Sequence, residues 1–448
     1  MKHSLKLIDI IAVGSMLFAF FLGAGNIIFP PLAGQLAGDN LLTAIIGFLL
    51  TAVGLPLITI VAIAISGGSW EHLTKDLPKY VATLIAILIF IIIGPAFAAP
   101  RTALVAYEMA VKPFFINTMQ LDLVIFSAVF FTIIIFFAWS RGGLINIIGK
   151  ILTPILFICL VILAIAVFID PQGKIISAHG EYITHPLQKG FLEGYNTMDI
   201  FGSLMFGVLI VDTLRSKGIT ESSIISKYLI RSACIAAIGL TFVYISLFYL
   251  GATSTSVASN ADNGALILSL YVQSLFGAHG QIVLSLIVLL ACLTTAIGLI
   301  SACSEYFSSL TPFSYKHWVV INSVICATVA NIGLSQLIIV SIPVLFTLYP
   351  VAITLVTLAF IRKKLPNTKM AYCVVIFIAL LFACLDALKV VGIDVSVFNI
   401  LPLFEVGMSW LIPTITAIIA MFFVDENHSR HESVKETSKK KLDRWLEF

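Results

Sequence analysis

Charged residues are scarce in this sequence of 448 residues. Asp, Glu, Lys and Arg make up 11% of it, less than half of the roughly 25% that is usual in soluble domains. Hydrophobic residues make up 60%. The composition excludes a soluble domain and predicts an all-α integral membrane protein that crosses the bilayer several times. The net charge of +3 gives no indication of a nucleic-acid partner, and we expect none.

Motifs for nucleotide hydrolysis and for catalysis are also missing. The nearest approach to the phosphate-binding motif G-x-x-x-x-G-K-[ST], residues 143–150, has one residue too many, and Ile151 stands where the hydroxyl belongs. This disfavours an ATP-driven pump. Several histidines lie in polar loops or in the tail, where we expect them to be solvated: His179, His185, His428 and His431. We predict that the protein is not an enzyme and that it uses no cofactor.

Long apolar runs make up most of the chain. A helix that spans a bilayer needs roughly 20 apolar residues, and on that scale twelve runs qualify. They lie near residues 8–33, 41–66, 80–107, 121–139, 145–169, 191–213, 228–251, 281–303, 313–331, 337–361, 371–390 and 397–424. We predict one transmembrane domain, residues 1–424, and a charged cytoplasmic tail, residues 425–448. The stretch 265–278 is too short to span upright and is predicted to lie over the outer face.

The distribution of Lys and Arg supports this count. With the N-terminus inside, 21 of the 26 basic residues fall on the cytoplasmic side. Four fall on the opposite side, and Arg101 lies within a run. Because cytoplasmic loops carry the excess of basic residues, we expect both termini in the cytoplasm. No predicted outer loop carries a pair of cysteines, so we expect no disulfides.

The first run is interrupted in its middle, in the segment AFFLGAGNIIFPPLAGQLA, residues 19–37. Gly-Ala-Gly-Asn at residues 23–26 and the Pro-Pro pair at residues 30–31 favour a broken helix. Broken spanning helices are tolerated only where the freed backbone groups are buried in protein or line a cavity. In transporters such cavities hold substrate and ions, so this break predicts a binding site.

A second interruption follows in the sixth run, GFLEGYNTMDIFGSLMFGVLIVD, residues 190–212. Gly202, Ser203 and Gly207 interrupt this run, and an acid, Asp199, lies within its apolar stretch. Because five is an odd number, helices 6–10 start on the opposite side of the membrane from helices 1–5. The pattern predicts two inverted five-helix repeats with broken first helices, followed by helices 11 and 12. This is the arrangement of the leucine-transporter fold.

Five segments resemble the signatures of one family. They are GAGNIIFPPLAGQLAG (23–38), GPAFAAPRTALVAYE (94–108), GFLEGYNTMDIFGSLMFG (190–207), ACLTTAIGLISACSEYF (291–307) and FNILPLFEVGMSW (398–410). Over nearly the whole chain except the tail, the sequence resembles the bacterial branched-chain amino acid transport system II carrier proteins, which are symporters of leucine, isoleucine and valine with a cation. The resemblance implies uptake of L-leucine, L-isoleucine and L-valine with Na+ across the bacterial plasma membrane by alternating access. Coupling to H+ and, less favoured, a cation channel are the alternatives.

The first break offers groups that suit a substrate. The amides freed at Gly23, Ala24 and Gly25 stand at the positive end of a helix dipole and suit a carboxylate. Close packing of small residues is the alternative. Asn26 follows where related sodium-coupled folds place an ion-binding amide, although a buried asparagine bonded to neighbouring backbone fits the sequence as well. Carbonyl groups near both breaks suit an ammonium group or Na+: those of Ala19, Phe20 and Leu22, and those of Phe201 to Leu204, which include Ser203.

The eighth run offers the other half of a cation site. Thr294 and Thr295 present adjacent hydroxyls, and the carbonyl of Ala291 lies one turn earlier. Hard oxygen ligands of this kind suit Na+, and by analogy with the fold the carbonyls of Ala19 and Leu22 complete the site. The alternative is that each hydroxyl bonds to a carbonyl of its own helix.

Apolar walls near the breaks suit an aliphatic side chain, with Phe20, Phe21 and Phe201 as candidates. With 33 phenylalanines in the chain, each of them also fits a place in the core or against lipid. One methylene discriminates between ligands by only about 1–3 kcal/mol, so such a pocket would accept Leu, Ile and Val together.

Three ionisable residues in or next to apolar runs are further candidates. Asp199 is predicted to pair with the substrate ammonium, to gate the outer path or to hold a structural partner such as Tyr195. Arg101 either has a gating role or extends its side chain to the outer interface. Lys150 lies at the start of the fifth run, where some proton-coupled relatives of this fold carry a lysine.

Overall fold

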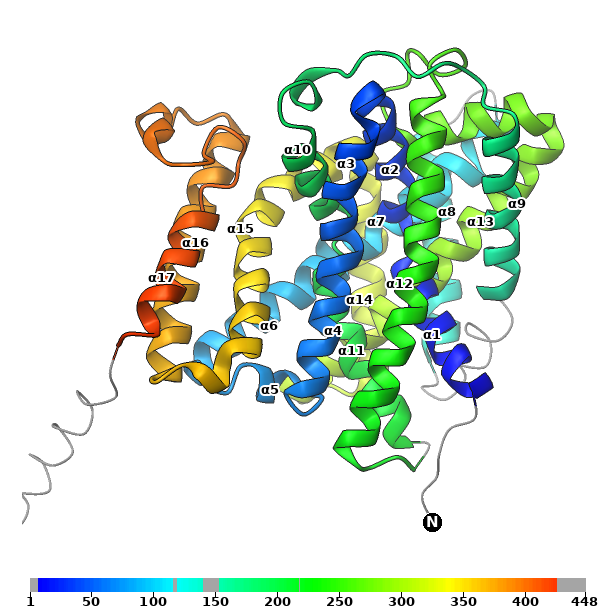
Figure 1. Cartoon of the computed structure of the whole chain (residues 1–448). Coiled ribbons are helices and arrows are strands. Elements are labelled where there is room, and N and C mark those ends of the chain that lie inside the picture. The colour runs from blue at the N-terminus through cyan, green and yellow to red at the C-terminus, as the bar shows by residue number, and fades with distance from the viewer. Residues whose placement is uncertain (1–6, 116–118, 140–152, 217, 425–448) are drawn as a thin grey trace, which may run out of the picture.

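The computed structural model describes residues 7–115, 119–139, 153–216 and 218–424, which are helical and contain no strand (Figure 1). The first half contains α1 (Leu7–Phe21), α2 (Ala24–Ala37), α3 (Leu41–Leu49), α4 (Leu55–Ile65), α5 (Trp70–Leu73), α6 (Lys79–Ile91), α7 (Ala98–Ala110), α8 (Gln120–Ala138) and α9 (Thr153–Ile169). The second half contains α10 (Pro186–Glu193), α11 (Asp199–Ser216), α12 (Ser222–Ala252), α13 (Gly264–Leu310), α14 (Tyr315–Val329), α15 (Leu334–Ile361), α16 (Thr368–Val391) and α17 (Leu411–Met421).

Seven helical segments of the described chain are long and apolar enough to cross a membrane, or eight if the bent pair α10 and α11 is one span. Helices α1, α9 and α17 are apolar but shorter. The protein is therefore a multi-pass membrane protein. The count differs from the twelve apolar runs partly because α2, α3 and α4 are joined into one segment of 42 residues, Ala24–Ile65.

Helices α1 and α2 run through the interior of the bundle, where α2 packs against α12 and α13. Almost all of α2 is buried, including the polar Asn26 and Gln35. Figure 1 shows α10 at one end of the bundle and α5 at the opposite end, while α16 and α17 stand at the side, next to α15. Large apolar side chains on α16, among them Phe377 and Leu381, are exposed, as expected for a helix that faces lipid.

Glycines let α2 and α12 touch through their backbones. A Cβ at Gly34 would lie 2.1 Å from the carbonyl oxygen of Phe248, and one at Gly251 would lie 1.9 Å from that of Pro31. Small residues bring membrane helices together in this way, because lipid offers no hydrophobic driving force for helix association. This contact fixes the helix that follows the first break against the bundle.

The sixth run breaks earlier than predicted. A 3₁₀ turn, Gly194–Thr197, leads to Met198, which adopts the left-handed conformation with φ of 63°, and α11 then starts at Asp199. Helices α10 and α11 meet at an angle of 44° across this break. The predicted interruption at Gly202, Ser203 and Gly207 is wrong, since all three lie inside α11. Gly207 instead allows close packing, because a Cβ there would lie 2.7 Å from Cδ1 of Ile63.

The third and last apolar runs also differ from a single straight span. A π-helical turn at Ile92–Ala96 contains Gly94, whose φ of −87° and ψ of −114° are not helical, so the third run divides into α6 and α7. The last run, predicted over 397–424, is an α-helix only over Leu411–Met421. Leu403 and Gly407 have positive φ, and this interrupts the helix upstream.

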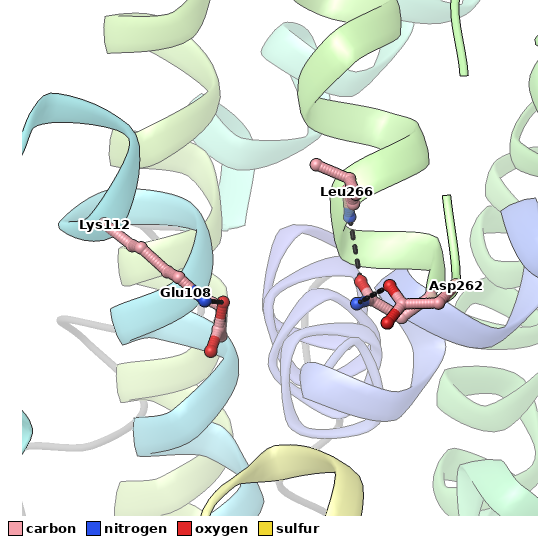
Figure 2. Close-up of polar contacts among 5 residues, drawn as sticks. Glu108, Lys112, Asp262 and Leu266 are labelled. Carbon is pink, nitrogen blue, oxygen red and sulfur yellow. Dashed lines mark hydrogen bonds and ion pairs between the residues drawn. The ribbon is translucent and has the colours of Figure 1, made fainter. Parts of the chain in front are cut away.

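Polar side chains stabilise the helix ends near residues 108–112 and 262–266, which Figure 2 shows together. Glu108 and Lys112 form an ion pair with a distance of 2.8 Å at the end of α7. At the start of α13 the side chain of Asn263 accepts a bond of 2.9 Å from the amide of Leu266. This α13 continues to Leu310 through a sharp kink at Gly277, so the stretch 265–278 forms a separate arm ahead of the long apolar segment.

Candidate substrate and ion site

The first break frees the amides at the start of α2. Helix α1 ends at Phe21 and α2 begins at Ala24, inside the segment that the sequence singles out. The residue before α2, Gly23, has an extended backbone and offers no capping side chain. The first amides of a helix have no acceptor within the helix. The Gly23 amide, one of the three predicted to be freed, instead donates to the carbonyl of Phe21 at 2.6 Å. The break therefore leaves the amides of Ala24 and Gly25 as the candidate donors at the positive end of a helix.

A small pocket lies at this break, with a cavity volume of about 30 Å³. That volume holds a water molecule or two and not an amino acid, so a substrate would need the pocket to widen. Six of the predicted substrate residues line it: Phe20, Gly23, Ala24, Gly25, Asn26 and Asp199. Phe21, Thr295 and the gating candidate Arg101 also line it, as do residues that the sequence analysis did not select, among them Met198 and Phe206.

Asn26, Asp199 and Tyr244 form one buried network of hydrogen bonds. The Asn26 amide donates to Oδ2 of Asp199 at 2.6 Å and also donates to the Tyr244 hydroxyl. The Tyr244 hydroxyl donates to the same carboxylate oxygen at 3.0 Å. Asn26 lies on α2 and Asp199 on α11, so the network joins the two broken helices through side chains. Tyr244 adds a bond from α12. The bonds of Asn26 therefore go to side chains and not to neighbouring backbone.

The predicted ion-site residues separate into two groups. The Thr295 hydroxyl donates to the carbonyls of Ala19 at 3.0 Å and Phe20 at 3.1 Å, at the end of α1. The Thr294 hydroxyl instead donates to the carbonyl of Ala291 at 2.9 Å, within its own helix. Leu22 is fully buried, and its amide donates to the carbonyl of Phe18. Three hard oxygens thus converge at α1, and Thr294 lies outside this cluster.

Phe201 and Ser203 do not line the pocket. The Phe201 ring contacts Tyr349 of α15 edge to face, with the ring centroids 4.8 Å apart. The Ser203 hydroxyl donates to the backbone carbonyl of Asp199 at 2.7 Å. Because the break lies at Met198, the segment from Phe201 to Leu204 is already helical.

Phe206 is a pocket residue that the sequence analysis missed. Its ring stacks on Phe20 at 5.0 Å and meets Phe21 at 5.7 Å, so three aromatic rings form the apolar wall. The helical spacing of Asp199, Gly202 and Phe206, at i, i+3 and i+7, places all three on one face of α11. This spacing is the signal that could have identified Phe206.

Arg101 is buried and only 3% exposed, which excludes the predicted extension of its side chain to the outer interface. It lies on α7, shortly after the break at Gly94, and lines the pocket. Its guanidinium stands against α2, because a Cβ on Gly25 would lie 2.6 Å from Nη2. Its Cζ lies 5.3 Å from the centre of the Phe29 ring. The third gating and coupling candidate, Lys150, lies outside the described residues.

Aromatic rings pack together just before the second break, in the turn that follows α10. Tyr195 is 1% exposed and stacks on Tyr349, with ring centroids 4.1 Å apart. Toward α5 lies a larger cavity of about 210 Å³, whose lining includes Trp70, Phe90 and Tyr306. The two sides of the break therefore differ: aromatic rings are packed toward α10, and a cavity lies toward α5.

A multi-pass helical bundle with a broken first helix at a small pocket is typical of membrane transporters. The chain belongs to the branched-chain amino acid transport protein family, which it matches over residues 6–428.

Two relatives and one solved structure are informative. The branched-chain amino acid transport system 2 carrier protein of Pseudomonas aeruginosa is 44% identical over 95% of this chain and 98% of its own length. The branched-chain amino acid permease BrnQ of Escherichia coli K12 is 41% identical over 96% and 98%. A Na+-coupled sialic acid symporter has the same fold with a TM-score of 0.60, at 16% identity, over 92% of this chain and 89% of its own.

Proposed function

We propose that this protein imports L-leucine, L-isoleucine and L-valine across the bacterial plasma membrane by symport with Na+, through alternating access. The substrate class is supported by the names of the relatives, which are carriers and permeases of branched-chain amino acids. The observation that carries the proposal for this chain is the break at Gly23 inside a pocket that combines the uncapped N-terminus of α2, a carboxylate and aromatic rings.

Each part of a branched-chain amino acid has a counterpart in the pocket. We assign the carboxylate to the side of the α2 amides at Ala24 and Gly25, and the ammonium to Asp199. The aliphatic side chain packs against the rings of Phe20 and Phe206, where burial of a Leu side chain contributes roughly 1.5–3 kcal/mol. The pocket must widen as the substrate enters.

The proposed Na+ site lies beside the substrate, where Thr295 of α13 meets the carbonyls of Ala19 and Phe20. These hard oxygens fit Na+, and they join α1 to α13, so an ion here would link a broken helix to its neighbour. Leu22, Ala291 and Thr294 remain part of the proposed Na+ site, but we expect each of them to contribute less to Na+ binding than Thr295 does.

Coupling to H+ is the second candidate. The buried carboxylate of Asp199 favours it, because a proton could take the place of a cation at that group.

The proposed topology is the same in both cases: twelve spans with two inverted five-helix repeats, both termini in the cytoplasm and a cytoplasmic tail from residue 425. Figure 1 agrees with this at one point, since α1 begins and α17 ends toward the α5 end of the bundle.

Uptake of labelled leucine into proteoliposomes tests the proposal. With an imposed Na+ gradient and no pH gradient we expect concentrative uptake that saturates and that isoleucine and valine inhibit. Uptake driven fully by a pH gradient without Na+ would replace Na+ by H+. A cation current that needs no amino acid would contradict symport and favour a channel. Liposomes without protein, and proteoliposomes with a collapsed Na+ gradient, serve as controls.

A further inference from the structure

Arg101 is a buried positive charge with unused hydrogen-bonding capacity. Its side chain is 3% exposed, and Nε and Nη1 have no hydrogen-bond partner among the described residues. Leaving a buried charged donor without a partner is costly, because its hydration is lost and nothing replaces it. Such a group in the interior of a membrane protein indicates an anion that is absent from the chain itself.

The surroundings of Arg101 point to where that anion binds. Its guanidinium lies against Gly25 in the first turn of α2, whose amides also lack acceptors within the helix. A Cβ on Gly25 would lie 2.6 Å from Nη2, so a side chain at this position would displace the guanidinium. A planar guanidinium beside a helix N-terminus is a strong site for a carboxylate, because the guanidinium can donate two parallel bonds.

The charge of Asp199 acts on Arg101 through space, without direct contact between the two groups. Asp199 lines the same pocket, but no ion pair joins it to Arg101 among the described residues. Instead, Asp199 accepts hydrogen bonds from Asn26 and Tyr244. A pocket with one cationic and one anionic side chain that are not paired with each other matches a zwitterion.

We propose that Arg101 binds the carboxylate of the transported amino acid and determines the selectivity for ligands that carry one; this inference rests on the proposed function. The break at Gly94 contributes by turning α7 so that Arg101 faces the pocket and not the membrane interface. Aliphatic selectivity then comes from the aromatic wall, and the requirement for a carboxylate comes from Arg101.

A competition assay on purified protein in nanodiscs tests this. Labelled L-leucine is displaced by unlabelled L-leucine or by leucinol, which keeps the ammonium and the aliphatic chain and has a hydroxymethyl group instead of the carboxylate. For the wild type we expect leucinol to bind on the order of 100-fold more weakly than leucine. Leucinol that competes as well as leucine at the wild type would overturn the inference without any variant.

The variants then assign the discrimination to Arg101. In Arg101→Gln we expect leucine to bind about as weakly as leucinol does, so that the ratio of the two affinities falls to near one, with partial recovery in Arg101→Lys. Arg231→Gln is the matched control, because Arg231 is exposed on α12, and both affinities should stay as in the wild type. An unchanged ratio in a folded Arg101→Gln protein would overturn the inference, since a merely structural arginine would lower both affinities together.

Gly25→Ala answers the same question if the Gln variant does not fold. Its methyl group would displace the guanidinium, so the ratio of leucine to leucinol affinity should fall with Arg101 still present. A folded Gly25→Ala protein with the wild-type ratio would count against Arg101. If folded wild-type protein bound neither leucine, isoleucine nor valine, the proposed function would fail, and this inference with it. An unchanged ratio in the variants, with leucine still bound, would overturn this inference alone and leave the proposed function in place.

Discussion

The two helix breaks meet at one pocket and offer opposite chemistry. At the first break α2 begins after Gly23, which brings no side chain, so no capping side chain bonds to the first amides of α2. At the second break α11 begins with Asp199, whose carboxylate is already held by hydrogen bonds from two other helices. The first break offers backbone hydrogen-bond donors, and the second offers a side chain that accepts hydrogen bonds. Similar breaks in one bundle thus present opposite chemistry, and under the proposed function they would divide the recognition of a zwitterion between them.

The pocket gains its polarity from this division. The positive side consists of the α2 amides and Arg101, and the negative side consists of Asp199. Helix dipoles alone would make both breaks positive, since α2 and α11 both start at the pocket. Asp199 in the first turn of α11 reverses the sign there.

The largest expected effect comes from a substitution at the first helix break. Gly25→Val puts a branched side chain where Nη2 of Arg101 lies 2.6 Å from an ideal Cβ and the carbonyl oxygen of Asn196 lies 3.1 Å away. We expect uptake of leucine to fall by roughly 100-fold or more while the protein still reaches the membrane. The measurement is initial uptake per folded protein in proteoliposomes.

Gly54→Val is the control for that variant. The nearest heavy atom to a Cβ at Gly54 is the carbonyl oxygen of Leu49, at 3.7 Å, so a Cβ there makes only an ordinary van der Waals contact. Normal leucine uptake by Gly25→Val would remove the first break from the mechanism. Equal loss in both variants would mean that valine in a spanning helix, and not the site, is responsible.

The next largest effect is expected from removing the negative charge at the second helix break. Asp199→Asn keeps an oxygen that can accept bonds from Asn26 and Tyr244, but it leaves the substrate ammonium without a counter-charge. We expect leucine affinity to fall by roughly 30-fold or more. Ser203→Ala, which removes only a bond to the backbone carbonyl of Asp199, should bind leucine as the wild type does. If Asp199→Asn binds leucine normally, the ammonium lies elsewhere.

The first break could be predicted from the sequence, and the second only in part. Gly23 and Gly25 interrupt an apolar run by their own backbone preferences, so local physics suffices there. The Pro-Pro pair at residues 30–31, which was also expected to favour the break, lies inside α2 instead. The second break lies at Met198, a residue that does not favour positive φ. Tertiary packing holds it, with Tyr195 stacked on Tyr349 just before it, and no local pattern reveals that contact.

Arg101 illustrates a signal that was present and not used. Its distance along the third run favoured the membrane interface as long as that run was treated as one straight helix. The Gly-Pro pair at residues 94–95 marks a break, and with that break Arg101 moves to the pocket. The apolar runs themselves follow from composition, because lipid requires about 20 apolar residues for each span.

A smaller effect is expected at the end of α1, just before the first break, where two adjacent threonines can be compared. Thr295→Val removes the hydroxyl that bonds to Ala19 and Phe20, whereas Thr294→Ala removes one that bonds within its own helix. We expect the Na+ concentration for half-maximal uptake to rise roughly 5- to 10-fold in the first variant and to change little in the second. Unchanged Na+ dependence in both would shift the case to H+ and to Asp199.

The smallest expected effect concerns the path that leads to the second break. Tyr195 is buried beneath Tyr349 at the α10 end, so a cysteine there is reachable only when that end opens. After replacement of the seven native cysteines, Tyr195→Cys should react with an impermeant thiol reagent at a rate that changes a few-fold with ligands. Na+ alone should speed labelling by favouring the outward-open state, and Na+ with leucine should slow it by occluding the pocket. Only the sign follows from the structure, because a ligand shifts such an equilibrium by its difference in affinity for the two states. Labelling that is fast and indifferent to both ligands would mean that the aromatic stack is no gate, and the second break would then face a static opening.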